Sequence, residues 1–337
     1  MLDRLDTADQ ALLDDFQRDF PLASRPFAAI GARIGLSEAD VIARLSALRA
    51  AGTITRVGAT VRPNTAGAST LAALAIPEDR IEEVAALVSQ EPGVNHSYLR
   101  EDDWNLWFVA TAPDATALKA ALERIEARTG LSVLDLRLKR AFNIDLGFSL
   151  RDRAARPCTT GTADLSALRE TDRPILHALA QGLDLVPQPY AALAARLGLA
   201  EPALTARIEA LSAARIITRL GVIVRHRAIG WSANAMVVWN LPESWPDDRI
   251  EAAGRALAAH PGITLCYERH TVPGLWPFGL FSMIHARSRS EALATLARAA
   301  ALPELAGVPH KPLFSTRCFK QTGARIAADA AKPEKAA

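Results

Sequence analysis

This sequence of 337 residues has few cysteines and no large excess of either charge. The three cysteines, Cys158, Cys266 and Cys318, are an odd number, lie far apart and form no Cys-x-x-Cys pair. This argues against a disulfide framework and against a zinc or iron–sulfur site, so we expect no metal ligands. The formal net charge is only +2, which gives no overall attraction to DNA or to a membrane surface. An anionic ligand would therefore need a local cluster of Arg or Lys.

Long apolar runs and several familiar catalytic loops are also missing. No stretch approaches the roughly 20 apolar residues of a membrane span, and the opening residues, MLDRLDTADQ, are too acidic for a signal peptide. The sequence has no Gly-x-Gly-x-x-Gly loop, no Walker-type Gly-Lys-Ser/Thr and no Gly-x-Ser-x-Gly elbow. The missing loops set several enzyme classes aside. The missing membrane span and signal peptide predict a cytoplasmic protein.

What the sequence does contain is a second copy of its own first segment. Asp9 matches Asp172, which is an offset of 172 − 9 = 163, and no gap is needed as far as Gly67 and Gly230. A repeat of this length is evidence of internal duplication. The same offset relates several identical pairs: Pro26 and Pro189, Gly35 and Gly198, Arg44 and Arg207, Arg56 and Arg219, Gly58 and Gly221, and Arg62 and Arg225.

Each copy begins with three helical patterns. In the third of them apolar residues recur three and four apart at Val41, Leu45 and Leu48, and Ser37 stands where an N-cap is expected. This order, followed by a strand, is typical of a winged helix-turn-helix. In the first copy the predicted helices are 8–15, 27–34 and 37–51, and the predicted strand is 53–62.

Each copy then changes to a mixed pattern of strands and helices. The β-α-β-β-α-β order is ferredoxin-like: two helices cover one face of the sheet, and the other face is free to pair with a second sheet or to cover a ligand. The first copy predicts a strand at 72–76, a helix at 78–90, strands at 96–100 and 104–111, a helix at 116–128 and a strand at 133–141. The second copy predicts strands at 235–241, 266–269 and 278–286, and helices at 248–260 and 290–300.

A helix-turn-helix before such a domain resembles the Lrp/AsnC transcriptional regulators. The predicted fold class is α+β, with two tandem copies of a winged helix-turn-helix plus a ferredoxin-like (βαββαβ) AsnC-type domain. We expect the two halves to pair within the chain, so that a monomer suffices. The expected units are 1–60, 61–150, a linker at 151–164, 165–222, 223–325 and a disordered tail at 326–337.

The candidate recognition helices weaken the interpretation as a DNA-binding regulator. The first, 37–51, sets two arginines against Glu38 and Asp40, and the second, 200–213, has a single arginine, Arg207. Specific DNA binding normally requires several phosphate contacts around the reading helix. DNA binding is therefore not expected, although a regulator that responds to a small ligand remains the alternative function.

Four longer motifs resemble the siroheme decarboxylase family, with the first half similar to one subunit type and the second half to its partner. The resemblance covers nearly the whole chain and implies removal of two acetate carboxyl groups from siroheme, giving 12,18-didecarboxysiroheme for haem d1 or for an alternative haem route. The motifs are GVNHSYLREDDWNLWF (93–108), ITRLGVIVRHRAIGWSANAM (217–236), GITLCYERHTVPGLWPFGLFSMIHA (262–286) and LFSTRCFK (313–320).

Siroheme as substrate also sets what the protein must supply. The ring can act as the electron sink, and its iron arrives with the substrate, so no cofactor is expected. The enzyme must orient the carboxylate, stabilise charge and deliver a proton to the new methyl carbon. A tetrapyrrole carrier without activity is a third reading of the same motifs.

Three candidate catalytic residues alternate along one predicted strand. Because side chains at i, i+2 and i+4 share a face, His96, Tyr98 and Arg100 should lie side by side. We interpret His96 or Tyr98 as the proton donor and Arg100 as the partner of a substrate carboxylate. Trp104 and Trp107 follow as candidate aromatic walls of a substrate pocket. A solvated edge strand is the alternative.

The second copy keeps only part of this set. Tyr267 and Arg269 are retained as substrate-binding candidates, but Leu265 stands where His96 falls. The halves are therefore chemically unequal. Either one half hosts the reaction while the other closes the pocket, or two sites of unequal rate each act on one acetate.

A cationic run follows the second helix-turn-helix. Strand alternation predicts Arg225 and Arg227 on one face, as carboxylate clamps, and His226 on the other. Arg62 is the first-copy equivalent of Arg225 and is a candidate clamp as well. His226 is a candidate proton donor or axial iron ligand, since imidazole suits iron. His285 follows an apolar strand and is a weaker candidate for the pocket. Solvated arginines and structural histidines are the plainer alternatives.

Overall fold

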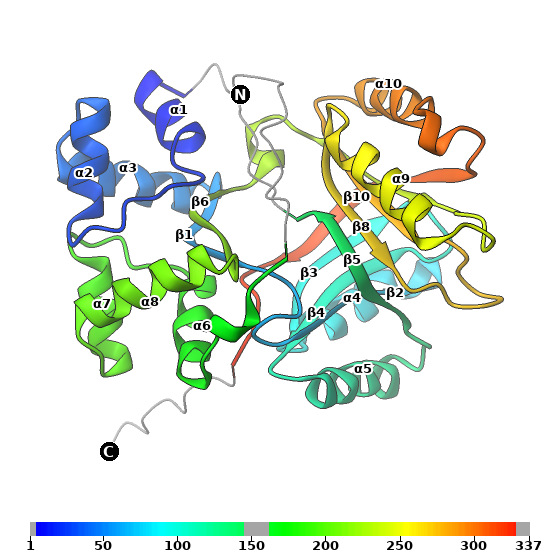
Figure 1. Ribbon diagram of the computed structural model, residues 1–337, viewed down its shortest axis with the longest axis horizontal. Helices are drawn as coiled ribbons and strands as arrows, with labels where there is room; N and C mark the ends of the chain where they lie inside the picture. The colour runs from blue at the N-terminus through cyan, green and yellow to red at the C-terminus, as the bar shows by residue number, and fades with distance from the viewer. Residues whose placement is uncertain (1–4, 145–161, 328–337) are drawn as a thin grey trace.

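The computed structural model describes residues 5–144 and 162–327. The expected linker and tail lie almost wholly outside these ranges. Figure 1 shows the two helix-turn-helix units at one end of the molecule and the strands of the two mixed units at the other. Among the described residues, no helix is both long and apolar enough to cross a membrane.

The helix-turn-helix units form where the sequence predicts them. The Ser37 hydroxyl accepts a hydrogen bond from the Asp40 amide, which confirms the expected N-cap. Gly35 and Gly198 end the second helix of each unit in the left-handed region, with φ of 75° and 66°, which glycine adopts at no steric cost. The helices are α1 (Thr7–Asp14), α2 (Pro26–Ile34), α3 (Glu38–Ala50), α6 (Arg173–Gln181), α7 (Pro189–Leu197) and α8 (Glu201–Ala213).

The two wing strands pair with each other. β1 (Ile54–Val61) and β6 (Ile217–Val224) are antiparallel, and Gly58 lies opposite Gly221. A Cβ atom at Gly58 would meet the Leu179 carbonyl oxygen at 2.4 Å, and one at Gly221 would meet the Gln17 carbonyl oxygen at 2.2 Å. The repeated glycine thus lets the end of α6 approach β1 and the turn after α1 approach β6. One apolar core joins both helix-turn-helix units.

The remaining strands close into one barrel of both halves. Their order is β10-β3-β4-β2-β5-β8-β9-β7, so the halves meet at two seams, β5–β8 and β10–β3. This confirms the expected pairing of the two sheets. The first half gives β2 (Ala68–Leu74), α4 (Ile81–Gln90), β3 (Val94–Arg100), β4 (Leu106–Ala112), α5 (Ala115–Thr129) and β5 (Leu134–Asn143). The second gives β7 (Ala233–Trp239), α9 (Asp247–Ala259), β8 (Ile263–Arg269), β9 (Leu280–Ala286), α10 (Arg289–Ala300) and β10 (His310–Gln321).

Apolar side chains pack on both faces of the barrel wall. Two clusters lie between the strands and the helices outside them. A third contains Trp107, Met236 and Phe281, drawn from both halves. Short 3₁₀ turns complete the chain at η2 (Glu78–Arg80), η3 (Leu165–Ala167), η4 (Glu170–Asp172), η5 (His226–Ile229) and η6 (Pro303–Leu305).

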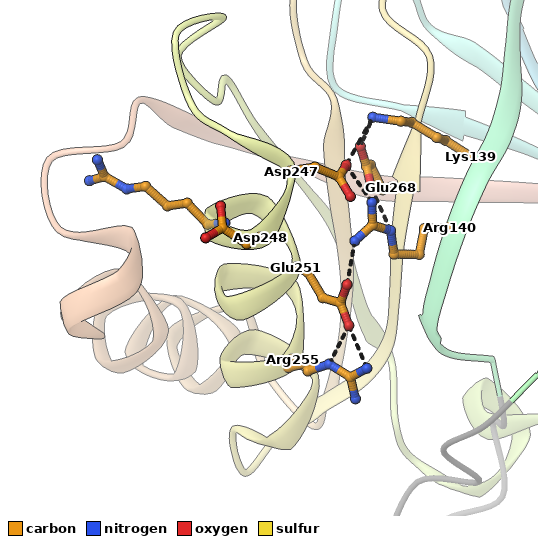
Figure 2. A network of polar contacts seen from close by, with 8 residues as sticks. Lys139, Arg140, Asp247, Asp248, Glu251, Arg255 and Glu268 are labelled. Carbon is orange, nitrogen blue, oxygen red and sulfur yellow. Dashed lines mark hydrogen bonds and ion pairs between the residues drawn. The ribbon is translucent and has the colours of Figure 1, made fainter.

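An ion-pair network spans the β5–β8 seam (Figure 2). Lys139 Nζ lies 2.6 Å from Glu268 Oε1, and Arg140 Nε lies 3.2 Å from Glu268 Oε2. Arg140 also reaches Asp247 at 2.5 Å and Glu251 at 2.9 Å on α9. Glu268 is the buried member, with 5% of its side chain exposed. The network joins β5 of the first half to α9 and β8 of the second.

Candidate functional site

A cavity in the barrel brings together the strand residues that the sequence singled out. Its volume is about 310 Å³, and both halves line it. A second cavity, of about 610 Å³, is lined by the β1–β6 sheet, η5 and the adjoining ends of β3 and β10. Polar residues that include His96, Tyr98, Asn234 and His285 line both, so the two adjoin. We call them the inner cavity and the outer cavity.

Two Tyr–Arg pairs face each other across the inner cavity. The Arg100 guanidinium carbon lies 5.6 Å from the Tyr98 ring centroid, and that of Arg269 lies 5.2 Å from Tyr267. Each arginine also crosses a seam: Arg100 Nη1 donates to the Leu313 carbonyl at 3.0 Å, and Arg269 Nη1 donates to the Leu136 carbonyl at 2.8 Å. The shared face that strand alternation predicted is confirmed, and the two arginines have equivalent backbone contacts.

Burial disfavours the charged form of all four side chains in the two pairs. It lowers the pKa of Arg100 and of Arg269 to about 10 and raises the pKa of Tyr98 and of Tyr267 above the usual value of a phenol. The Nε atom of each arginine is buried without a hydrogen-bond partner among the described residues. A buried cation with neutral partners is stabilised by a carboxylate that completes its hydrogen bonds.

His96 enters the same cavity as a neutral imidazole. Its Nδ1 lies 3.0 Å from the Asn95 side-chain oxygen, and its ring centroid lies 6.4 Å from that of Tyr98. Burial, and then the charge of Arg56, lowers the pKa of His96 to about 4. Because Asn95 Oδ1 accepts the Nδ1 proton, the Nε2 atom carries the lone pair.

A second histidine group comes from the other half. His285 on β9 contacts Thr264 and Asn234, and its ring centroid lies 5.2 Å from that of His226. Burial lowers the pKa of His285 to about 4 and that of His226 well below its usual value, and neighbouring charges act in the same direction. Sequence reasoning had ranked His285 as a weaker candidate and had missed Asn234 and Thr264.

The outer cavity is rich in cations. Arg56, Arg219, Arg225, Arg227 and Lys320 all line it. Burial, and then the charge of Arg219, lowers the pKa of Arg56 to about 10. Sequence reasoning did not select Arg56 or Arg219 as site residues, although the two arginines occupy the same position in both copies. That identity within the duplication is the signal that could have found them.

The prediction that Arg225, His226 and Arg227 lie on a strand is wrong. β6 ends at Val224, and His226–Ile229 forms the 3₁₀ turn η5, which closes at Gly230 with a φ of 97°. Strand alternation therefore does not place these side chains. Arg225, His226 and Arg227 nevertheless all reach the outer cavity, and Arg227 donates to the Ser315 carbonyl at 2.6 Å.

The prediction for Trp104 is also wrong. Trp107 lines the inner cavity and is 1% exposed, but Trp104 lines neither cavity because β4 begins only at Leu106. Trp104 instead accepts the Trp107 indole N–H at its carbonyl, at 2.5 Å. A residue that sequence reasoning missed, Trp276, packs against Trp107 with 5.2 Å between ring centroids. The other predicted residues of the inner cavity are His96, Tyr98, Arg100, Arg62, Tyr267, Arg269 and His285, and all line it.

Two family models match the chain, each in duplicate. A model described as "AsnC-like ligand binding domain" matches residues 66–143 and 228–320. A model described as "Siroheme decarboxylase NirDL-like HTH domain" matches residues 9–54 and 172–217. Both models recur once in each half, which agrees with the duplication in the sequence.

Curated relatives are similar over the full length or over half of it. A siroheme decarboxylase NirDL subunit from Paracoccus denitrificans is 61% identical over 327 residues, covering 97% of this chain and 99% of the relative. A siroheme decarboxylase NirD subunit from Stutzerimonas stutzeri is 47% identical over 148 residues, covering 44% of this chain and 97% of the relative. The chain therefore combines two regions that occur as separate subunits elsewhere.

Solved structures give the same correspondence. A crystal structure of the siroheme decarboxylase NirDL aligns with a TM-score of 0.65 at 26% identity, covering 95% of this chain and 94% of the other. A second, in co-complex with an iron-uroporphyrin III analogue, aligns with a TM-score of 0.64, also at 26% identity, and covers 94% of this chain and 93% of the other.

Proposed function

The chain belongs to the siroheme decarboxylase family, and we propose that it removes two acetate carboxyl groups from siroheme to give 12,18-didecarboxysiroheme. The identity of 61% over 97% of the chain supports this activity. The reaction supplies a step of haem d1 synthesis or of an alternative haem route. Each event converts R–CH₂–COO⁻ and one proton into R–CH₃ and CO₂.

The observation that carries the proposal is the pair of buried Tyr–Arg sites. Arg100 and Arg269 lie at equivalent positions of the two halves, and their hydrogen-bond partners among the described residues are neutral. Each is suited to bind one substrate carboxylate, because a guanidinium binds a carboxylate in a planar, two-pronged arrangement. The apolar lining of the inner cavity suits the flat ring, and the arginines of the outer cavity suit its other carboxylates.

His96 is the first candidate for the proton donor. Without substrate its pKa is about 4, so the ring is neutral near pH 7. A substrate carboxylate beside it favours the protonated form, because an opposite charge raises the proton affinity of an imidazole. After CO₂ leaves, the electron pair delocalises into the ring, and His96 passes its proton to the exposed methylene carbon. Tyr98 is the alternative donor in the first half.

His226 has a separate proposed role at the outer cavity. It lines that cavity beside Arg219, Arg225 and Arg227. A neutral imidazole there can ligate the iron that the substrate carries. Once protonated, it can instead donate a proton to the methylene carbon of the substrate. The chain needs no added cofactor in this scheme, since the substrate ring takes up the electrons and the iron is already part of the substrate.

The contacts of the recognition helices favour the enzyme over a DNA-binding regulator. Arg44 on α3 pairs with Asp6 at 2.7 Å and with Asp9 at 2.9 Å, and Arg207 on α8 pairs with Asp172 at 2.6 Å. These arginines are held within their own units and are not directed towards phosphates. We therefore propose that the duplicated helix-turn-helix serves as a packing surface.

The test is anaerobic incubation of the whole protein with siroheme, followed by mass spectrometry. We expect a product that has lost two CO₂ units. An unchanged mass together with an absorption shift on binding would contradict the enzyme and leave a tetrapyrrole carrier. A specific mobility shift with DNA fragments, reversed by siroheme, would instead support the regulator.

A further inference from the structure

A chain of hydrogen bonds crosses the barrel from the first half to the second. Arg100 Nη1 donates to Asn234 Oδ1 at 3.3 Å, and Asn234 Nδ2 lies 2.9 Å from His285 Nε2. His285 Nδ1 lies 2.7 Å from the Thr264 hydroxyl, which donates to the Met283 carbonyl at 3.0 Å. Five groups on β3, β7, β8 and β9 are thus linked end to end.

The groups at the two ends of this hydrogen-bond chain determine the direction of every hydrogen bond between them. An arginine can only donate, so the oxygen of the Asn234 amide must face Arg100, and its NH₂ group must face His285. The His285 Nε2 atom must then accept, which leaves the ring proton on Nδ1 of the neutral imidazole. The Thr264 oxygen accepts that proton and donates its own to the Met283 carbonyl, which can only accept.

We propose that Asn234 is a positioning residue, which holds His285 in the Nδ1–H tautomer and in return fixes Arg100 towards the inner cavity. The catalytic consequence rests on the proposed function: Arg100 binds a substrate carboxylate, and His285 keeps its Nε2 lone pair engaged by the amide. Within this hydrogen-bond chain His285 supports the carboxylate site, whereas His96, whose Nδ1 bonds to Asn95, is the candidate proton donor of the first half.

Among the described residues, the first half has no counterpart of this hydrogen-bond chain. The barrel registers place Ser69 opposite Thr111 where Asn234 lies opposite His285, and Asn95 stands at the position of Thr264. Arg269, the equivalent of Arg100, bonds to the Leu136 carbonyl and to no side-chain amide among the described residues. The two arginines are therefore alike in backbone contacts and unlike in what orients them.

Nitrogen-15 NMR of histidine-labelled protein tests the tautomer without any substrate. The signals of His285 are assigned by their loss in His285→Gln. We expect a protonated Nδ1 and an unprotonated Nε2 in the wild-type protein. In Asn234→Asp the carboxylate accepts from both neighbours, so the proton should move to Nε2. Ser69→Ala, at the matching position of the first half, should leave the His285 tautomer unchanged. A protonated Nε2 in the wild-type protein would overturn the proposal.

Steady-state kinetics on siroheme then tests the positioning role. Asn234→Leu should raise KM about tenfold, the loss expected for one hydrogen bond to a charged group, and should change kcat less. Thr264→Val is a second variant, in case Asn234→Leu folds poorly: Asn234 still donates to Nε2, so His285 should keep its Nδ1 proton. A move of that proton to Nε2 in Thr264→Val would contradict the role given to Asn234. An unchanged KM in Asn234→Leu would contradict the positioning of Arg100. Wild-type protein without turnover would contradict the proposed function and leave the NMR result standing.

Discussion

The two ends of the inner cavity show what the duplication kept and what it changed. Both keep a Tyr-x-Arg strand end whose arginine crosses a seam to a backbone carbonyl, at 3.0 Å for Arg100 and 2.8 Å for Arg269. The histidines differ: the first half carries His96 on β3, and the second carries His285 on β9. The arginines that we propose as carboxylate ligands are thus duplicated, whereas the histidines lie on different strands in the two halves.

We expect the largest loss of activity when the first half is made to resemble the second. His96→Leu copies the residue found at Leu265 and should lower the decarboxylation rate about 10²–10⁴-fold, the range expected for loss of a general acid. Product formation followed by mass spectrometry measures it, and binding of siroheme followed by absorbance shows whether the cavity survives.

A second variant places a histidine at the equivalent position of the second half. In the His96→Leu protein, Leu265→His should fail to restore activity, because the neighbouring Thr264 hydroxyl is already shared between His285 and the Met283 carbonyl. His96, in contrast, has the Asn95 oxygen at 3.0 Å. Recovery of activity in the double variant would contradict the claim that the halves have diverged in their proton-carrying groups.

The two arginines offer the next largest effect. Arg269→Met should lower kcat/KM about 10²-fold, since truncating one partner of a buried charge pair costs about 2–5 kcal/mol. Arg100→Met should cost about tenfold more, because it also removes the hydrogen bond to Asn234. Kinetics on siroheme measure both, with Arg100→Lys and Arg269→Lys as controls that keep the charge and lose the planar geometry. Equal losses would show that the Asn234 contact adds nothing.

The sequence predicted the parts of the site that depend on local spacing. A period of two along one strand placed His96, Tyr98 and Arg100 on one face, and the same argument placed Tyr267 and Arg269. It failed where the strand itself was misjudged: Trp104 precedes β4, and the run after Val224 turns into η5. Local spacing is therefore informative only as far as the strand boundaries are correct.

The contacts between the halves could not be predicted from spacing. Arg100 meets Asn234 and the Leu313 carbonyl, which lie 134 and 213 residues further along the chain. Such partners follow from the closure of the barrel at two seams, and the sequence predicted only that the two sheets would pair. The duplication did contain one unused clue: Arg56 and Arg219 are identical in both copies and meet in the outer cavity.

The two seams differ as well, and this predicts the smallest effect. At the β5–β8 seam Glu268 is 5% exposed and contacts Lys139 and Arg140, whose side chains are 42% and 24% exposed. At the β10–β3 seam the ion pair of Arg317 with Glu82 is open to solvent, with 53% and 70% exposure. Glu268→Gln should lower the free energy of unfolding by about 1–2 kcal/mol, because water compensates the two cations only in part.

Glu82→Gln is the matched control at the other seam and should cost less than about 0.5 kcal/mol, as for other exposed pairs. Urea denaturation of the whole chain measures both variants, and added salt should reduce the small effect more than the large one, because screening acts chiefly on exposed charges. Equal losses would mean that burial of Glu268 gives the β5–β8 seam no advantage. The halves would then be held by the strand pairing at both seams and by the shared helix-turn-helix core.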